Sequence, residues 1–352
     1  MTKDLTKTEK QRRAGVREKT GRLPVPAVLL LLVLPVLTGL VCLCIGRVGL
    51  TVSDVFDAFR KAFSGEAENT ISYVTVMRLR LPRILMAMCV GAGLSCAGCA
   101  FQSLFANPLA TPDTVGVASG ASFGAALGIL FGFSMAGIQG VSFLMGIIAA
   151  ALTFFIGRRE DRALHTVILA GIMIGALFSA LVSLVKFTAD SETELPAITY
   201  FLMGSLSNAN YRTLLYGAVP IVISIIVLFL LRWRLNLLPY GEDEVRTLGV
   251  NMQALRLVTI ILATLLSASC VSMCGQVGWI GLLVPHMCRM LFKNNHMSLI
   301  PASVSIGAAF MVIVDTIARS VTAAEIPVSV LTALIGAPFF IFLMRKSGGW
   351  KL

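Results

Sequence analysis

The sequence has little charge. Only 13% of its 352 residues are Asp, Glu, Lys or Arg, three are histidine, and 57% are hydrophobic. Because soluble globular domains carry about 25% charged residues, most of this chain cannot fold as a water-soluble domain. The shortage of polar residues indicates an all-α polytopic membrane protein.

Motifs of nucleotide and zinc-hydrolase chemistry are missing. The chain contains no GxxxxGK[ST] phosphate loop and no HExxH, so it encodes neither nucleotide hydrolysis nor a familiar zinc hydrolase centre. Three scattered histidines form no cluster for a membrane enzyme or a metal ion, and we expect no cofactor. If the protein transports actively, the energy comes from elsewhere.

The eight cysteines do not predict a disulfide framework. All of them fall in or beside apolar stretches, where thiols act as small hydrophobic groups: Cys42, Cys44, Cys89, Cys96, Cys99, Cys270, Cys274 and Cys288. Cys96 and Cys99 form a CxxC pair, but glycine and alanine surround it. Buried packing is the simpler interpretation, with metal or redox use as the alternative.

Long apolar windows, by contrast, are plentiful. About 20 apolar residues cross a bilayer core, and such windows fall near residues 24–46, 81–103, 112–133, 135–157, 164–187, 211–231, 253–274, 278–292, 299–319 and 327–345. We predict about ten transmembrane helices in a single domain over residues 24–345. Gly275, Gly278 and Pro285 interrupt the seventh and eighth windows, which could instead form one broken helix.

Basic residues orient these spans. Residues 1–23 form a tail with eight Lys or Arg against three acids, followed by an apolar run too long for a signal-peptide core. With both termini cytoplasmic, including the C-terminus at residues 346–352, 20 of the 29 Lys and Arg lie inside. Topology thus explains the net charge of +11, and nothing calls for a nucleic-acid partner.

A short amphipathic helix is predicted between the first two spans. Helical periodicity places five apolar residues on one face: Val52, Val55, Phe56, Phe59 and Phe63. We expect this helix to lie at the outer membrane surface, against lipid.

Three arginines stand at the outer end of the second span, in the segment MRLRLPR: Arg78, Arg80 and Arg83. Cations are unfavourable there both for topology and for the helix dipole. They could meet carboxylates of an external partner, or lipid phosphates.

Glycine and other small residues follow in GAGLSCAGCA, residues 91–100, at a spacing typical of close helix packing. The next segment, FANPLATPDTVG, contains Asn107, Pro108 and Leu109 in a predicted turn at the cytoplasmic face. That turn could be a gate or a plain capped turn.

The loop at residues 238–250 is the most polar internal cytoplasmic segment, and its length suits one short helix. It is either a solvated charge run or a docking helix for a cytoplasmic motor. The residues concerned are Gly241, Glu242, Asp243, Glu244, Arg246, Leu248 and Gly249.

Charged and kinking residues also occur inside the apolar segments. Asp315 and Arg319 stand four residues apart in the order that favours an ion pair; they either neutralise each other or place Arg319 at the outer mouth. Pro285 and His286 lie in GQVGWIGLLVPHMCR, where a structural hydrogen bond is a simpler role for the histidine than a metal site.

Together these stretches resemble the FecCD-type (BtuC-like) permeases, the membrane subunits of ABC importers for ferric siderophores, haem and cobalamin. The resemblance rests on ordered motifs over nearly the whole chain after the tail: RLPR at 80–83, residues 91–121, GEDEVRTLGV at 241–250, GWIGLLVPHMCR at 278–289, and Asp315 to Phe340.

The resemblance implies the type II importer fold, a homodimer or a pair with a sister permease, two cytoplasmic ATPase subunits and an extracytoplasmic substrate-binding protein. Arg80, Arg83 and Arg319 would dock the binding protein, and residues 241–250 would form the coupling helix on the ATPase. The turn at Asn107, Pro108 and Leu109 would belong to the cytoplasmic gate. Val245 departs from the alanine usual in the family, which puts the fit to the ATPase in doubt.

We therefore expect a permease in the cytoplasmic membrane of a prokaryote, without enzymatic chemistry of its own, that passes a ferric siderophore or similar metal chelate. Haem and cobalamin are alternative substrates. An ion-coupled carrier or channel is the competing class, but it would normally show midplane acids on several spans, and Asp315 is the main one here.

Overall fold

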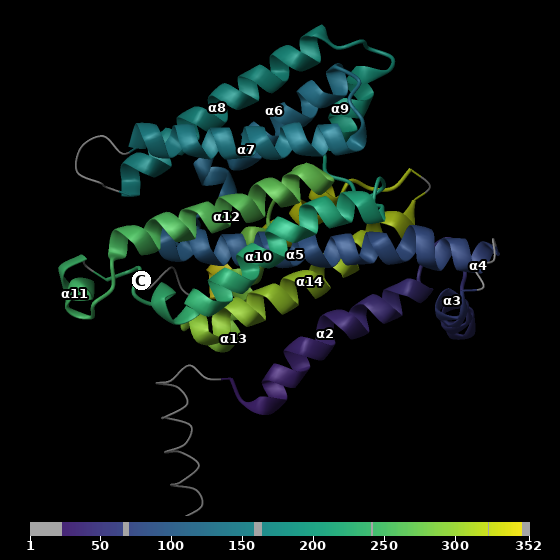
Figure 1. Cartoon of the computed structure of the whole chain (residues 1–352), viewed down its shortest axis with the longest axis horizontal. Coiled ribbons are helices and arrows are strands. Elements are labelled where there is room, and N and C mark those ends of the chain that lie inside the picture. The colour runs from purple at the N-terminus through teal and green to yellow at the C-terminus, as the bar shows by residue number, and fades with distance from the viewer. Residues whose placement is uncertain (1–22, 66–69, 158–163, 241, 323, 347–352) are drawn as a thin grey trace, which may run out of the picture.

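The computed structural model describes residues 23–65, 70–157, 164–240, 242–322 and 324–346, and every regular element in those ranges is helical (Figure 1). Seven helices are long and apolar enough to cross a membrane, and three more apolar helices are shorter. The predicted set of about ten apolar helices is thus confirmed. Residues 1–22 of the predicted tail and residues 347–352 lie outside the described ranges.

The helices follow one another along the chain as α2 (Val25–Cys44), α3 (Val52–Ser64), α4 (Ile71–Tyr73), the π-helix η1 (Val74–Arg80), α5 (Leu81–Leu104), the 3₁₀-helix η2 (Pro112–Val115), α6 (Val117–Leu130), α7 (Met135–Gly157), α8 (Leu164–Thr188), α9 (Glu194–Leu202), α10 (Tyr211–Leu235), α11 (Glu242–Thr247), α12 (Met252–Cys274), α13 (Ile280–Phe292), α14 (His296–Val321) and α15 (Val328–Lys346).

Local sequence explains where several helices begin. Asn210, Asn251 and Asn295 precede α10, α12 and α14, and each side-chain oxygen accepts a hydrogen bond from a backbone N–H of the first turn. Thr51 and Asp54 form a reciprocal capping box at the start of α3.

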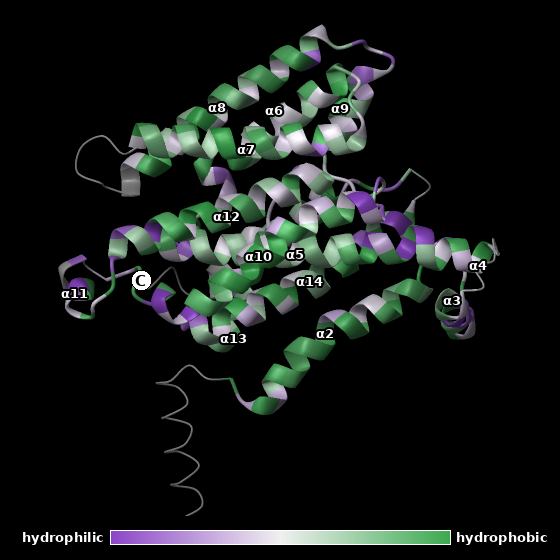
Figure 2. Ribbon diagram, in the orientation of Figure 1, coloured by the Kyte–Doolittle hydropathy of each residue, from purple (hydrophilic) through white to green (hydrophobic). Residues whose placement is uncertain are grey.

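The helix α5 is the centre of the bundle. In the most apolar 18-residue stretch of the helical segment that contains α5, 83% is buried inside the chain. The corresponding share is 22% for α2, α8 and α10, which leave much apolar surface exposed. In Figure 1, α6 to α9 form a group on one side, α10, α12 and α14 lie around α5, and α2 lies along the opposite side. Hydrophobic residues cover most of the helices in Figure 2, as expected for surfaces that face lipid or partner subunits.

Small residues allow the closest contacts of α5, as the sequence predicts. A Cβ atom at Gly91 would lie 2.2 Å from Gly307 O on α14, and one at Gly98 would lie 1.8 Å from Gly281 O on α13. Cys96 and Cys99 are completely buried in this packing. Backbones that approach this closely exclude any side chain larger than hydrogen at Gly91 and Gly98.

The seventh and eighth apolar windows form two helices rather than one. Near the end of α12, Cys270 Sγ lies 3.6 Å from Val90 O, whereas α13 begins against Gly98, about 12 Å further along α5. The non-helical residues 275–279 bridge this distance inside the bundle. The helix α13, at 13 residues, is therefore a half-helix too short to cross a bilayer core of about 30 Å.

The predicted amphipathic helix is α3, which lies at the end of the bundle opposite α11 (Figure 1). Val55 and Ala58 are buried, while Val52, Phe56 and Phe63 are 76%, 70% and 91% exposed. Only one edge of the apolar face contacts the chain itself. Its predicted position against lipid stays a prediction.

Candidate functional site

The extended segment at residues 275–279 interrupts the helical bundle at membrane depth. Gly275 and Trp279 bracket it with positive φ angles of 75° and 68°. Gly275 is required because a Cβ there would lie 1.9 Å from Phe201 O, whereas Trp279 is a non-glycine residue in a conformation that costs free energy. Such backbone strain is typical of functional segments.

Space is open beside this segment. No atom lies within 4 Å of the Cβ position at Gly278, and among the described residues the backbone N–H groups of 276–278 donate to no backbone carbonyl. A hollow of about 20 Å³, enough for about one water molecule, lies next to it and is lined by residues of five elements, among them Leu94, Thr111, Asp113, Gln276 and Trp279. Non-helical backbone at membrane depth is tolerated where protein buries it or where it lines a water-filled cavity, so this segment is suited to a polar path.

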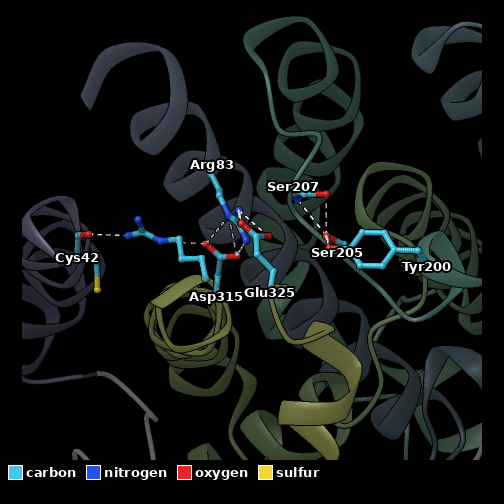
Figure 3. Close-up of polar contacts among 8 residues, drawn as sticks. Cys42, Arg83, Tyr200, Ser205, Ser207, Asp315 and Glu325 are labelled. Atoms are coloured by element: carbon cyan, nitrogen blue, oxygen red, sulfur yellow. Dashed lines mark hydrogen bonds and ion pairs between the residues drawn. The ribbon is translucent and has the colours of Figure 1, made fainter. Parts of the chain in front are cut away.

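A buried ionic cluster lies at the start of α5 (Figure 3). Arg83 donates through Nε to both oxygens of Asp315 at 3.0 Å and through Nη2 at 2.8 Å, while its Nη1 lies 3.0 Å from Glu325 Oε1. Side-chain exposure is 11% for Arg83, 1% for Asp315 and 27% for Glu325. Arg319 Nε is 3.8 Å from Asp315 Oδ2. The predicted intrahelical pair therefore exists, but Arg83 is the principal partner of Asp315.

Two arginines of this region hold the end of α2. Arg80 donates to the carbonyl oxygens of Leu43 and Val48 at 2.6 and 2.5 Å, and Arg319 donates to Cys42 O at 2.7 Å. The last carbonyls of a helix have no intrahelical partner and carry partial negative charge. The two guanidinium groups satisfy carbonyls at and just beyond the end of α2, which gives these intramembrane cations a structural role.

The predicted docking arginines are thus engaged within the chain. Arg80 and Arg319 are 4% and 8% exposed, and the carboxylates that pair with Arg83 are its own chain's Asp315 and Glu325. Arg78, in the same segment, is exposed. Docking of a partner on Arg80, Arg83 and Arg319 remains a prediction.

At the end of the bundle opposite α3, the predicted coupling segment forms the short helix α11 (Figure 1). Arg246 Nη2 lies 3.8 Å from Glu242 Oε1, and Glu242 also accepts a hydrogen bond from Gln253 Nε2 at 3.1 Å. The segment ends at Gly249, with φ of 71°. Glu244 is exposed, whereas Gly241 and the side chain of Asp243 lie outside the described part.

Side chains of α11 and of the turn after it point either into the protein or outward. Val245 is 1% exposed and belongs to the main hydrophobic core, whereas Leu248 is 61% exposed. A hollow of about 300 Å³ lies between α11 and the start of α12, lined by Glu242, Arg246 and residues 249–253. The side chain of Val245, which is larger than the alanine usual in the family, therefore packs inside this chain. It does not lie on the surface that α11 would present to an ATPase.

The predicted gate segment is a strained turn. Asn107 Oδ1 accepts a hydrogen bond from Leu109 N at 2.9 Å, Ala110 N donates to Asn107 O at 3.1 Å, and Ala106 has φ of 46°. Pro108 is half-buried and Leu109 is 49% exposed. This is a side-chain-stabilised turn with an apolar tip; its gate role stays a prediction.

The other intramembrane residues that the sequence singles out have packing environments. Pro285 is buried within α13, and the His286 ring lies 5.6 Å from the Phe340 ring on α15, edge to face. The sequence also contains one GxSxG segment that was not recognised as a candidate site, Gly120 to Gly124, which lies inside α6 with Ser122 4% exposed. A nucleophilic serine of that motif sits on a sharp strand-to-helix turn, so this segment is helix packing.

Sequence reasoning missed a polar cluster near the inner end of α5. Gln102, Ser103 and His296 are 3%, 5% and 5% exposed. Gln102 donates to Gly281 O on α13, Ser103 contacts His296 on α14, and His296 bonds to Asn236. A lone histidine gives no signal by itself. The asparagines that flank the helix ends were the available hint.

Comparison with known proteins decides the family. The profile of the FecCD transport family matches residues 31–346, almost the whole chain. The chain belongs to the FecCD transport family. It is a multi-pass permease subunit of an ABC importer, and ATP hydrolysis takes place in a separate subunit.

Individual relatives agree with this membership. The molybdate import system permease protein of Haemophilus influenzae is 43% identical over 317 residues, covering 90% of this chain and 94% of the relative. A probable iron chelatin transport system permease protein of Helicobacter pylori is 35% identical over 276 residues, covering 78% and 84%. A solved inward-facing metal-chelate type ABC transporter shares 42% identity and a TM-score of 0.83, covering 91% of this chain and 99% of the other.

Proposed function

We propose that two copies of this FecCD-family chain form the substrate path of an ATP-driven importer, with ATPase subunits on α11 and a binding protein at the opposite end. The observation that carries the path is the extended segment 275–279, whose backbone faces open space at Gly278. α3 and α11 lie at opposite ends of the bundle (Figure 1), which leaves separate surfaces for the two partners.

A metal-bearing anion is the substrate class that we propose. Identity is 43% to the molybdate permease and 35% to the iron chelatin permease, so molybdate is the first candidate. A ferric siderophore, which the sequence alone favours, is the second. Both are polar complexes that would need a hydrated path rather than a lipid-like one.

The docking of a binding protein would use the outer ionic cluster. A partner carboxylate would most easily replace Glu325 on Arg83, because Glu325 is 27% exposed whereas Asp315 is 1% exposed. Arg80 and Arg319 would become available only if they left the carbonyls at the end of α2. Arg78 is already exposed.

The experiment is ATP-dependent uptake into proteoliposomes that contain the chain, its co-encoded ATPase and its binding protein. Labelled molybdate and a labelled ferric siderophore are offered separately. Uptake of one of them that requires ATP and both partners supports the proposal. Flux of either without ATPase or binding protein would instead indicate a channel or carrier.

Docking is tested in the same vesicles. Arg83→Glu should abolish uptake while the ATPase stays bound, because like charges would face the partner's carboxylates. Arg234→Glu is the control, because it reverses the charge of an exposed arginine in the last turn of α10, away from the proposed docking surface. If Arg83→Glu binds the binding protein with unchanged affinity, the docking assignment is wrong.

A further inference from the structure

His296 joins three parts of the chain that are far apart in sequence. Its backbone N and its Nδ1 both donate to Asn236 Oδ1 at 2.9 Å, and its Nε2 contacts Ser103 Oγ. Asn236 Nδ2 in turn donates to Asn295 Oδ1 at 3.1 Å. The start of α14, the end of α10 and the end of α5 are therefore held by one set of polar contacts.

The adjacent residue of α5 holds α13 in the same place. Gln102 Nε2 donates to Gly281 O at 3.3 Å, and Arg289 Nη1 donates to Gln102 Oε1. Gln102 therefore contacts both the first and the last turn of the half-helix. Gln102 contacts α13 and the adjacent Ser103 contacts α14, so the last turn of α5 is bonded to both helices.

Two residues of this cluster are close in sequence to the predicted coupling helix α11 and to the predicted gate turn at residues 107–109. Asn236 stands directly after α10, in the connection to α11. Ser103 stands in the last turn of α5, directly before the turn at Asn107 to Leu109, and Asn107 N donates to Gln102 O at 3.1 Å.

Burial makes this cluster resist separation. A buried polar group that loses its partner bears its full desolvation penalty, because water cannot replace the bond. Ser103 and His296 are each 5% exposed. Movement of the α10–α11 connection must therefore either leave buried groups unpaired or take the start of α14 and the end of α5 with it.

We propose that Asn236, His296 and Ser103 are positioning residues that couple displacement of α11 by the ATPase to the turn at Asn107 to Leu109. This inference rests on the proposed function. It assigns to the buried histidine a part in coupling rather than in metal binding or substrate recognition.

The test uses Leu109→Cys as a reporter in the complete importer with ATPase and binding protein. Its labelling by a membrane-impermeant maleimide is measured without nucleotide and after trapping with ATP and vanadate. The same chain with Leu109 intact corrects for the native cysteines. The ratio of the two labelling rates reports movement of the turn.

Asn236→Leu should reduce the nucleotide-dependent change about fivefold or more, within the usual range for coupling between sites, with the ATPase still bound and hydrolysing ATP. Asn236→Asp should retain more of the change than Asn236→Leu, since a carboxylate still accepts from both N–H groups of His296 and loses only the donation to Asn295. Ser298→Ala is the matched control, because Ser298 is 4% exposed in the same turn of α14 but bonds only to the nearby Phe292 and Asn295 carbonyls.

An unchanged ratio in Asn236→Leu, or an equal loss in Ser298→Ala, overturns the inference. If Asn236→Leu does not assemble, Ser103→Ala tests the other side of His296 with a smaller deletion and the same readout. The proposed function fails separately, when the wild-type importer takes up neither molybdate nor the ferric siderophore.

Discussion

Replacing Arg83 should destabilise the protein far more than replacing a surface arginine. Arg83→Met leaves Asp315, whose side chain is 1% exposed, without its closest partner. Breaking a buried pair by removing one member costs roughly 3–5 kcal/mol. Arg319 Nε remains 3.8 Å from Asp315 Oδ2, so we expect a loss near the lower limit, about 3 kcal/mol.

The double replacement Arg83→Met with Asp315→Leu should recover most of that loss. No uncompensated carboxylate is then buried, and apolar groups of similar size fill the space. Arg319 keeps its bond to Cys42 O. We expect a coupling free energy between the two positions of about 2 kcal/mol.

The assay is reversible unfolding of the purified protein in mixed micelles with increasing SDS, followed by far-UV circular dichroism. Glu325→Gln serves as the comparison, because its side chain is 27% exposed and its pair with Arg83 should contribute only about 1 kcal/mol. The reasoning is refuted if Arg83→Met costs less than Glu325→Gln, or if the double replacement costs the sum of the two single ones.

Three further predictions concern other parts of the chain. Gly98→Ala should destabilise the fold by about 1–3 kcal/mol in the same assay, because the new Cβ would lie 1.8 Å from a backbone oxygen that cannot rotate away; an unchanged midpoint would disprove the close packing. Val245→Ala should lower stability by about 2 kcal/mol yet leave co-purification of the ATPase unchanged, since the side chain is buried in its own chain; loss of the ATPase with unchanged stability would contradict this. The Thr51 hydroxyl and backbone N–H hold the pKa of Asp54 below its usual value, so the first turn of α3 keeps this stabilisation above the ordinary carboxyl pKa and loses it as the pH falls through the lowered one. Amide hydrogen exchange in that turn should therefore show reduced protection at acidic pH after correction for intrinsic rates, and Asp54→Asn should remove the dependence.

Sequence predicted the elements whose causes are local. The apolar helices were predicted because the thickness of the bilayer core sets the length and hydropathy of a span. The small residues around Gly91 and Gly98 correctly indicated close packing, because only glycine permits backbone contact at those distances.

Sequence could not predict the partners of the buried polar residues. Arg83 pairs with carboxylates 232 and 242 residues away, and His296 contacts Ser103 at a separation of 193 residues. The residues around an arginine in the sequence do not show whether it pairs with a carboxylate of an external partner or with one of its own chain. The sequence predicted a separate apolar helix at residues 278–292, but not that α13 has only 13 residues and is too short to cross the bilayer core.

These long-range contacts all meet on α5, which explains why that helix is buried along its length. Its first turn carries the Arg83 ion pairs, its middle carries the backbone contact of Gly91 with α14, and its last two turns carry Gly98, Gln102 and Ser103. A shift of α5 against its neighbours would break the geometry of the buried ion pairs. It would also open a gap at the close backbone contacts. The helix α5 is thus held to α14 at both ends, by the ion pair of Arg83 with Asp315 at one end and by the contact of Ser103 with His296 at the other.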